Sequence, residues 1–272
     1  MLGNRSLIRG VLDFMIRSSL GLALVSSLIS LEARAGERSP VLVELFTSEG
    51  CSSCPPADAV LERLERNQPV PNAQIISLGF HVDYWNQLGW ADPFSSAEFS
   101  LRQEEYSNAF GGDRIYTPQM VVDGSREFVG EEAKAIRSVA EASARPKARI
   151  EMTLSPRCEL SSKLKVSVGQ LSNLSKTDPP ELLVAITESG LASQVRRGEN
   201  AGRTLRHTAV VRQLRSLGEV QRQTTEDFVA STQLSVDKAW KRSALQVVAF
   251  LQEKKGRHIL GAAAKPLCDA AR

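Results

Sequence analysis

Two cysteines separated by two serines stand between a run of residues with strand character and a segment with helical periodicity. The apolar run 41–46 precedes Cys51 and Cys54, and apolar side chains recur at helical spacing through residues 57–66. The pattern predicts that the pair lies where a buried strand turns into a helix. The unpaired N–H groups of a first helical turn favour negative charge, so we expect the Cys51 thiolate to be the stabilised one.

The spacing of the two cysteines suits thiol–disulfide exchange. Cys51, just ahead of the helix, would be the nucleophile, and Cys54, about one turn into the helix, is close enough to attack a mixed disulfide formed at Cys51. A static disulfide and half of a zinc site share this spacing, so both alternatives stay open. Zinc usually needs a second ligand pair, and the other cysteines, Cys158 and Cys268, are far apart in the sequence.

The first 35 residues have the features of a secretory signal. Arg5, Arg9 and Arg17 form a basic start, residues 18–31 are uncharged and mostly apolar, and the small residues Ala33 and Ala35 flank Arg34 in the small-x-small pattern of a cleavage site. The apolar run is shorter than the roughly 20 residues that span a bilayer, and an uncleaved anchor or a buried helix is the alternative. We therefore expect a periplasmic or secreted protein with no membrane-spanning segment after cleavage, in a compartment where disulfides form.

Charge and composition limit the classes of partner. The chain has 34 basic and 31 acidic residues, and this near balance makes nucleic acid an unexpected partner. Hydrophobic residues make up 42% and charged residues 24%, a mix that excludes wholesale disorder and is typical of a folded globular protein.

Alternating strand and helix patterns over residues 41–145 predict the order β-α-β-α-β-β-α. A parallel crossover followed by a hairpin turn at Asp123-Gly124 and a closing helix makes one compact domain. After Pro146, short apolar runs between polar turns predict a sandwich. Residues 204–217 fit both a helix and a strand, and we favour strand because the neighbouring segments are strands. The predicted organisation is a signal at 1–35, an α/β domain at 36–146 and a β-rich, sandwich-like domain at 147–272.

The residues Tyr116-Thr117-Pro118 precede the third predicted strand. With the strand–Cys-x-x-Cys–helix arrangement, they resemble the thioredoxin superfamily, whose members carry a cis-proline facing the cysteine pair. The resemblance implies a thioredoxin-like fold for the first domain, a cis peptide at Pro118 that shapes a groove for extended substrate backbone, and a partner contact through the Thr117 backbone. A trans-proline at a strand start is the expectation without the resemblance.

Glu44 interrupts the apolar run before the cysteines. Thioredoxins carry a buried acid at a similar place, with one fewer residue before the first cysteine. The resemblance implies that Glu44 is a proton relay for Cys54, because burial raises the pKa of such an acid and lets it exchange a proton with the second cysteine. The alternative is an acid that faces solvent from the strand.

Polar and aromatic residues follow the second predicted strand. In the predicted topology, strand ends crowd the N-terminus of the first helix, so His81 or Asp83 would tune the thiolate. Tyr84, Trp85 and Trp90 would form an apolar wall for a peptide. The alternative is a core aromatic cluster with a hydrogen-bonded histidine. A Cys-Cys-His set would also suit copper or zinc.

Basic residues gather around the segment 198–202, namely Arg196, Arg197, Arg203, Arg206 and His207. They indicate an anionic partner, or docking of this segment onto the first domain. A solvated loop between strands is the alternative.

Cys158 and Cys268 bracket the predicted second domain. A disulfide between them would close a loop of about 110 residues and would contribute nearly 5 kcal/mol by the chain-entropy model. Buried free thiols are the alternative to this structural disulfide.

Four stretches that span both predicted domains resemble a family of exported thioredoxin-like proteins, domain of unknown function 1223. They are VELFTSEGCSSCPPAD at 43–58, HVDYWNQLGWADPF at 81–94, YTPQMVVDG at 116–124 and GENAGRTL at 198–205. The resemblance covers most of the chain beyond the signal and implies the fold more firmly than an activity.

The sequence therefore predicts an exported α/β thioredoxin-like domain, followed by a β-rich domain, that catalyses thiol–disulfide exchange without a cofactor. Its partners would be protein thiols or disulfides. Catalytic roles are expected for Cys51, Cys54, Pro118 and Glu44, and substrate-binding roles for Thr117, Tyr84 and Trp85. The alternative is a metal-binding or structural, partner-binding module on the same scaffold without turnover. Reductase, oxidase and isomerase differ by reduction potential, which the Ser52-Ser53 dipeptide alone does not set.

Overall fold

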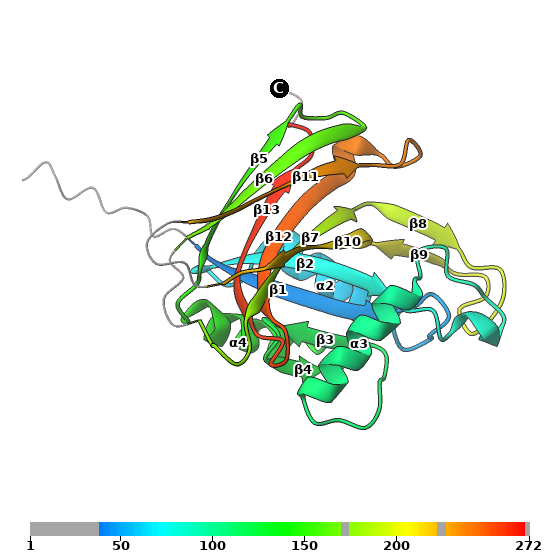
Figure 1. The fold of residues 1–272 in the computed structure, drawn as a ribbon. Coiled ribbons are helices and arrows are strands. Elements are labelled where there is room, and N and C mark those ends of the chain that lie inside the picture. The colour runs from blue at the N-terminus through cyan, green and yellow to red at the C-terminus, as the bar shows by residue number, and fades with distance from the viewer. Residues whose placement is uncertain (1–37, 170–173, 222–226, 270–272) are drawn as a thin grey trace, which may run out of the picture. The chain divides into compact units, whose positions relative to one another are not determined.

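The computed structural model describes residues 38–169, 174–221 and 227–269. The predicted signal at residues 1–35 lies outside these ranges. Residues from Arg38 onward belong to one compact unit, and Figure 1 colours its elements along the chain. No helix within the described ranges combines the length and apolarity needed to cross a bilayer.

The first part of the chain has the element order that the sequence predicts. Its elements are β1 (Ser39–Thr47), α2 (Pro55–Asn67), β2 (Ala73–His81), the short 3-10 helix η1 (Asn86–Leu88), α3 (Ala97–Ala109), β3 (Gln119–Val122), β4 (Arg126–Phe128) and α4 (Glu132–Ser143). Local signals set the helix starts. Prolines occupy the first turn of α2, where a missing N–H costs no hydrogen bond. The Ser96 side chain caps α3 by accepting from the Glu98 N–H.

The later part of the chain is built almost entirely of strands. They are β5 (Arg149–Ser155), β6 (Ser161–Gly169), β7 (Pro180–Glu188), β8 (Leu191–Gln194), β9 (Thr204–His207), β10 (Val210–Glu219), β11 (Phe228–Ser235), β12 (Leu245–Glu253) and β13 (Ile259–Pro266), with a short 3-10 helix η2 (Arg242–Ala244). The ambiguous segment 204–217 forms β9 and most of β10, with a break at Ala209, whose φ is +49°. The preference for strand there is confirmed.

Strands from both parts of the chain share one eight-stranded sheet. Its order is β13-β12-β7-β10-β2-β1-β3-β4, so β10 and β2 join the two parts. At this junction the Gly79 N–H donates to the Ala209 carbonyl at 2.8 Å. A Cβ on Gly79 would lie 3.2 Å from the Thr208 carbonyl oxygen, so the close approach favours glycine. Separate domains were predicted at 36–146 and 147–272, whereas the eight-stranded sheet includes strands from both ranges.

The helices lie on both faces of the sheet around β1. Side chains alternate along a strand, so Val43 and Leu45 pack on the face covered by α2 and α4, and Leu42 and Phe46 pack on the opposite face with α3. The second face also includes residues of the later strands, among them Phe250 of β12. In Figure 1, α3 crosses in front of the sheet and α2 lies behind it. The described part of the chain is therefore a mixed, sheet-rich α/β fold.

A second sheet, β11-β6-β5, packs against the strands at the other end of the large sheet. The core between them is apolar and takes alternate residues of β5, β6, β7 and β12, such as Met152, Val166, Val184 and Val247. Two sheets that enclose one apolar layer form a sandwich-like arrangement in this part of the molecule.

Candidate functional site

The disulfide Cys51–Cys54 lies between β1 and α2, and neither cysteine has exposed surface. Cys54 is the N-cap of α2, and its carbonyl accepts from the N–H groups of Ala57 at 2.9 Å and Asp58 at 3.1 Å. The expectation that Cys54 lies one turn inside the helix is corrected, because the helix begins at Pro55, a residue suited to the first position. The pair nevertheless lies at the positive end of the helix dipole.

A hairpin from the later part of the chain contacts the cysteine loop. Strands β8 and β9 form this β8–β9 hairpin, residues 191–207, which is a two-stranded sheet separate from the large one. At its tip, the buried Asn200 side-chain amide donates to the carbonyl oxygens of Glu49 and Cys51, each at 2.9 Å. Docking of this segment onto the first part of the chain was one of the two functional expectations for it.

A second contact joins the hairpin tip to the residue after Cys51. The Ser52 N–H donates to the Glu199 carboxylate at 2.9 Å. Hydrogen bonds from the side chain and the backbone of Ser52 lower the pKa of Glu199, because they favour its charged form. Ser53 has its hydroxyl oxygen 3.3 Å from the Cys51 sulfur, and both serines are exposed. Solvent therefore reaches the middle of the loop but not the sulfurs.

The Thr117–Pro118 peptide is cis, as the thioredoxin resemblance implied. Pro118 comes directly before β3, and the antiparallel register pairs Gln119 of β3 with Phe46 of β1. Pro118 therefore lies beside the end of β1 from which the cysteine loop departs.

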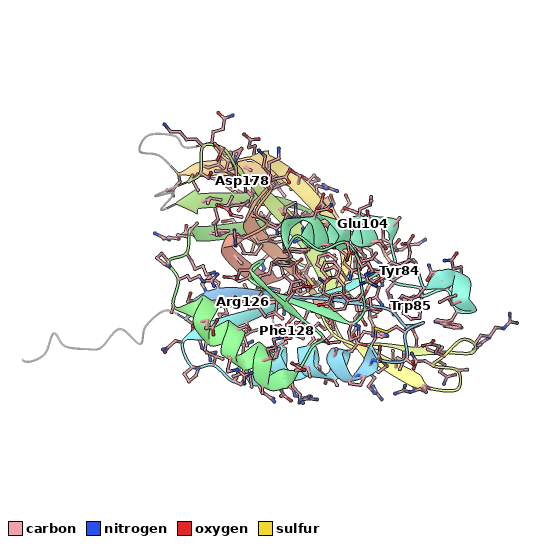
Figure 2. The ribbon with its side chains drawn as sticks, turned by 90° about the horizontal axis from the view of Figure 1, so that it is seen from below. Tyr84, Trp85, Glu104, Arg126, Phe128 and Asp178 are labelled. Carbon is pink, nitrogen blue, oxygen red and sulfur yellow. A yellow bond between two sulfur atoms is a disulfide. The ribbon has the colours of Figure 1, made fainter. Side chains whose placement is uncertain are left out.

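Trp85 links the cis-proline segment to the cysteine loop. Its indole N–H donates to the Thr117 hydroxyl at 2.9 Å, and its Cβ lies 3.0 Å from where a side chain on Gly50 would begin. The half-buried Tyr84 donates its hydroxyl to Gln103 at 3.1 Å, and burial raises its pKa. Figure 2 labels Tyr84 and Trp85, which lie next to each other. The predicted substrate-binding residues Thr117 and Trp85 are thus brought together, and Tyr84 adjoins them.

Glu44 lies on the other face of the sheet from the helix that carries Cys54. Its carboxylate pairs with Arg102 of α3 at 2.7 Å and accepts from the Tyr106 hydroxyl. Gln252 of β12 joins the same buried network by accepting from Arg102 at 3.0 Å. The expected proton relay from Glu44 to Cys54 is therefore corrected, since strand alternation directs this acid away from α2.

Other ionisable side chains gather near the cysteine loop, and sequence reasoning did not assign most of them. We call them the acid–histidine cluster: Glu49, Asp58, His81, Asp92 and His207. Asp92 accepts from the Glu49 N–H at 2.8 Å and lies 2.7 Å from His81 Nδ1. His207 Nε2 lies 2.9 Å from the Glu49 carboxylate, and the two histidine rings are edge to face with centroids 4.7 Å apart.

Burial and neighbouring charges shift three pKa values in the acid–histidine cluster. Burial raises the pKa of Asp58, against the attraction of His207 and His81. Burial opposes the charged form of His81, but Asp92 more than compensates, so the pKa of His81 is raised. Burial likewise opposes charge on Asp92, and His81 with the backbone N–H donors lowers its pKa overall.

Asp83 and Trp90 have partners that differ from the expectations. Asp83 accepts from the Ser100 hydroxyl of α3 at 2.6 Å and so is directed toward that helix. The Trp90 indole donates to the Glu49 carboxylate at 2.7 Å. Trp90 therefore supports the acid beside the cysteines, and it is half-buried rather than part of an open wall.

The outlying cysteines form a disulfide, Cys158–Cys268, which closes a loop of 110 residues. Cys158 is exposed and Cys268 is buried. The pairing considered from sequence is confirmed.

Comparisons with known proteins give a family. The family model described as "Protein of unknown function (DUF1223)" matches residues 42–252, well over half of the chain. The chain belongs to the DUF1223 family. No curated protein matches it.

Two solved structures resemble this DUF1223 chain over most of its length. A structural-genomics protein from Agrobacterium tumefaciens is 23% identical, with a TM-score of 0.68 over 88% of this chain and 99% of that one. HBP35 of Porphyromonas gingivalis is 15% identical, with a TM-score of 0.60 over 86% of this chain and 76% of that one. Likeness at these identities shows a shared fold.

The missed residues of the DUF1223 site had weak signals in the sequence. Glu49 stands two residues before Cys51, and Asp58 is an acid in the first turn of the helix, but neither spacing names a partner. Asn200 lies in the GENAGRTL stretch, yet nothing in its local pattern says that it reaches the cysteines from the later part of the chain.

Proposed function

We propose that this DUF1223 protein is an exported, thioredoxin-fold thiol–disulfide oxidoreductase that acts through Cys51 and Cys54. One observation carries the proposal: the disulfide stands at the N-terminus of α2, beside the strand that begins after cis-Pro118. Trp85 supports it further by contacting both segments. Two disulfides are compatible with export to an oxidising compartment.

In the proposed reaction the reduced protein attacks with the Cys51 thiolate. A Cys51–substrate sulfur bond forms, the substrate disulfide breaks, and one substrate sulfur leaves as a thiolate that takes up a proton. Cys54 then loses its proton and attacks the Cys51 sulfur, which releases the second substrate sulfur as a thiol. The substrate gains two electrons and two protons, the protein loses them as its disulfide forms, and the reverse steps oxidise a dithiol.

The local electrostatics favour this assignment of roles. The positive end of the α2 dipole favours a thiolate just ahead of the helix. Ser53 is near enough to donate its hydroxyl to the Cys51 sulfur. Asp58 lies in the first turn of α2, the helix that Cys54 caps. Burial raises the pKa of Asp58, which suits an acid that exchanges a proton with a thiol. We therefore assign the proton-relay role to Asp58 in place of Glu44.

A structural role for the Cys51–Cys54 disulfide is the second candidate. Complete burial of both cysteines supports it, because inert structural disulfides are shielded from reductants. The metal-binding alternative has less support. Among the described residues, no three His, Cys, Asp or Glu side chains are arranged as a metal site.

Trapping of a mixed disulfide tests the proposed function. Reduced Cys54→Ala protein, mixed with a model disulfide, should accumulate a mixed disulfide at Cys51, whereas Cys51→Ser should form none at Cys54. The double variant Cys158→Ala/Cys268→Ala is the matched control and should exchange like the wild type. Equal exchange by wild type and Cys51→Ser, or no exchange by either, would reject the oxidoreductase and leave the structural disulfide.

A further inference from the structure

The proposed exchange requires access to a sulfur that the structure seals. Cys51 and Cys54 have no exposed surface, although the two serines between them are exposed. The attack on a disulfide needs an approach along the S–S direction by a third sulfur. Some covering group must therefore move before a partner's sulfur reaches Cys51.

The hairpin tip makes the backbone contacts beside Cys51 that a partner's backbone would make. Asn200 donates to the Cys51 carbonyl, and Glu199 accepts from the Ser52 N–H. These are one donor and one acceptor on neighbouring residues, the same pair that an extended chain presents to the edge of a loop or strand. The hairpin tip thus occupies the hydrogen-bonding positions beside Cys51.

The hairpin is attached in a way that lets its tip leave. Its two strands form a sheet of their own, so release of the tip breaks no bond of the large sheet. The base is anchored by buried Leu205 and by His207 on Glu49. The tip is held by the polar contacts of Asn200 and Glu199, and glycines flank it at 198 and 202 with φ of +76° and +81°.

We propose that the β8–β9 hairpin is a gate over Cys51–Cys54, opened when the extended backbone of a protein partner takes the Ser52 N–H and the Cys51 carbonyl from the hairpin tip. This proposal rests on the proposed function for the identity of the partner. The closed gate shields the disulfide from small thiols and reserves it for a partner that supplies both backbone contacts.

The rate of disulfide reduction tests the gate in the full chain. The protein is treated with dithiothreitol, quenched with acid, and alkylated so that mass spectrometry reads each cysteine pair separately. The Cys158–Cys268 disulfide, with Cys158 exposed, is an internal reference in the same molecule. The gate predicts that Cys51–Cys54 is reduced more slowly than this reference in the wild type.

Variants of the tip should speed reduction of one disulfide only. Asn200→Ala removes three side-chain hydrogen bonds, two of them to the cysteine loop, and should speed reduction of Cys51–Cys54 at least about tenfold, and Glu199→Gln should speed it less. Asn108→Ala, at an exposed asparagine of α3, is the matched control and should change neither rate. Because Glu199 is exposed, Glu199→Gln tests the gate even where Asn200→Ala loosens the whole fold.

The outcomes separate the gate from the proposed function. Unchanged reduction of Cys51–Cys54 in both tip variants, relative to the reference disulfide, overturns the gate. Faster reduction of that pair alone supports it. Exchange of the reduced variants with a model disulfide is then measured. Faster reduction without exchange would reject the proposed function and keep the gate. Exchange without faster reduction would reject the gate and keep the proposed function.

Discussion

Glu44 is a buried charge whose role depends on the face of the strand that it occupies. It pairs with Arg102, and both side chains are at most 3% exposed. Removal of one partner leaves an uncompensated buried charge, so Glu44→Gln should lower the free energy of unfolding by about 3–5 kcal/mol. Chemical denaturation measures this loss, with Glu104→Gln at an exposed position of α3 as the control.

The same variant separates two roles for Glu44. Its position across the sheet predicts that exchange at Cys51 in folded Glu44→Gln keeps the wild-type pH profile. If the folded Glu44→Gln variant showed a shifted pH profile of exchange, Glu44 would again be the candidate proton relay. Asp58→Asn should instead shift the profile, because Asp58 lies in the first turn of the helix that Cys54 caps.

The His81–Asp92 pair predicts a pH window of stability. His81 has a raised pKa, so its contribution is complete below the ordinary value of 6.5 and is lost as pH rises through the raised value. Asp92 has a lowered pKa, so its contribution is complete above the ordinary value of 3.8 and is lost as pH falls through the lowered value. The pair therefore contributes most between about pH 4 and 6.5.

Urea denaturation of Asp92→Asn at pH 5.5 and pH 9 measures this window. The wild type should lose stability between the two pH values as His81 deprotonates, and Asp92→Asn should lose less. An equal loss in both proteins would show that the pair does not carry this part of the pH dependence.

At the scale of elements, the hairpin turn between β3 and β4 was predicted from Asp123-Gly124 alone. Both residues have positive φ, +55° and +64°, as a tight two-residue turn requires. A Cβ on Gly124 would also lie 1.9 Å from the Arg257 carbonyl oxygen, a contact that no local pattern contains.

Because of that contact, we expect alanine to destabilise the protein more at Gly124 than at Gly111. Gly111 has a similar φ of +72° with nothing within 4 Å of an added Cβ, so Gly111→Ala should cost only about 1–2 kcal/mol of backbone strain. Gly124→Ala carries the same strain and the clash, and should lower the unfolding free energy by clearly more. Equal losses in thermal or urea denaturation would mean that the Arg257 loop moves freely.

Local patterns predicted the elements well and their tertiary partners poorly. The strand before Cys51 and the helix after it are set by residues close in sequence, whereas the cis peptide at Pro118 was expected only from the thioredoxin resemblance. The Asn200 contact on Cys51 and the Arg102 pairing with Glu44 join residues 149 and 58 positions apart, and sequence periodicity holds no information on such pairs. The helix start also differed, because Pro55 moved the cap to Cys54.

At the scale of the whole molecule, the two predicted domains depend on one another for their cores. Phe46 and Phe80 from the first part pack in one cluster with Leu183, Val211 and Phe250 from the later part. A fragment of residues 36–146 would expose this face and the edge of β2. We expect this fragment to show no cooperative thermal transition by circular dichroism, whereas residues 36–272 unfold in one transition. A fragment with native-like, cooperative unfolding would establish two independent domains.

The reduction potential of the Cys51–Cys54 couple distinguishes a redox-active pair from a structural disulfide. The full chain is equilibrated in thiol–disulfide buffers of graded potential, and alkylation with mass spectrometry reads this pair apart from Cys158–Cys268. We expect a midpoint between about −120 and −270 mV, the range of thiol–disulfide oxidoreductases. A pair that stays oxidised below about −300 mV, as structural disulfides do, would contradict it.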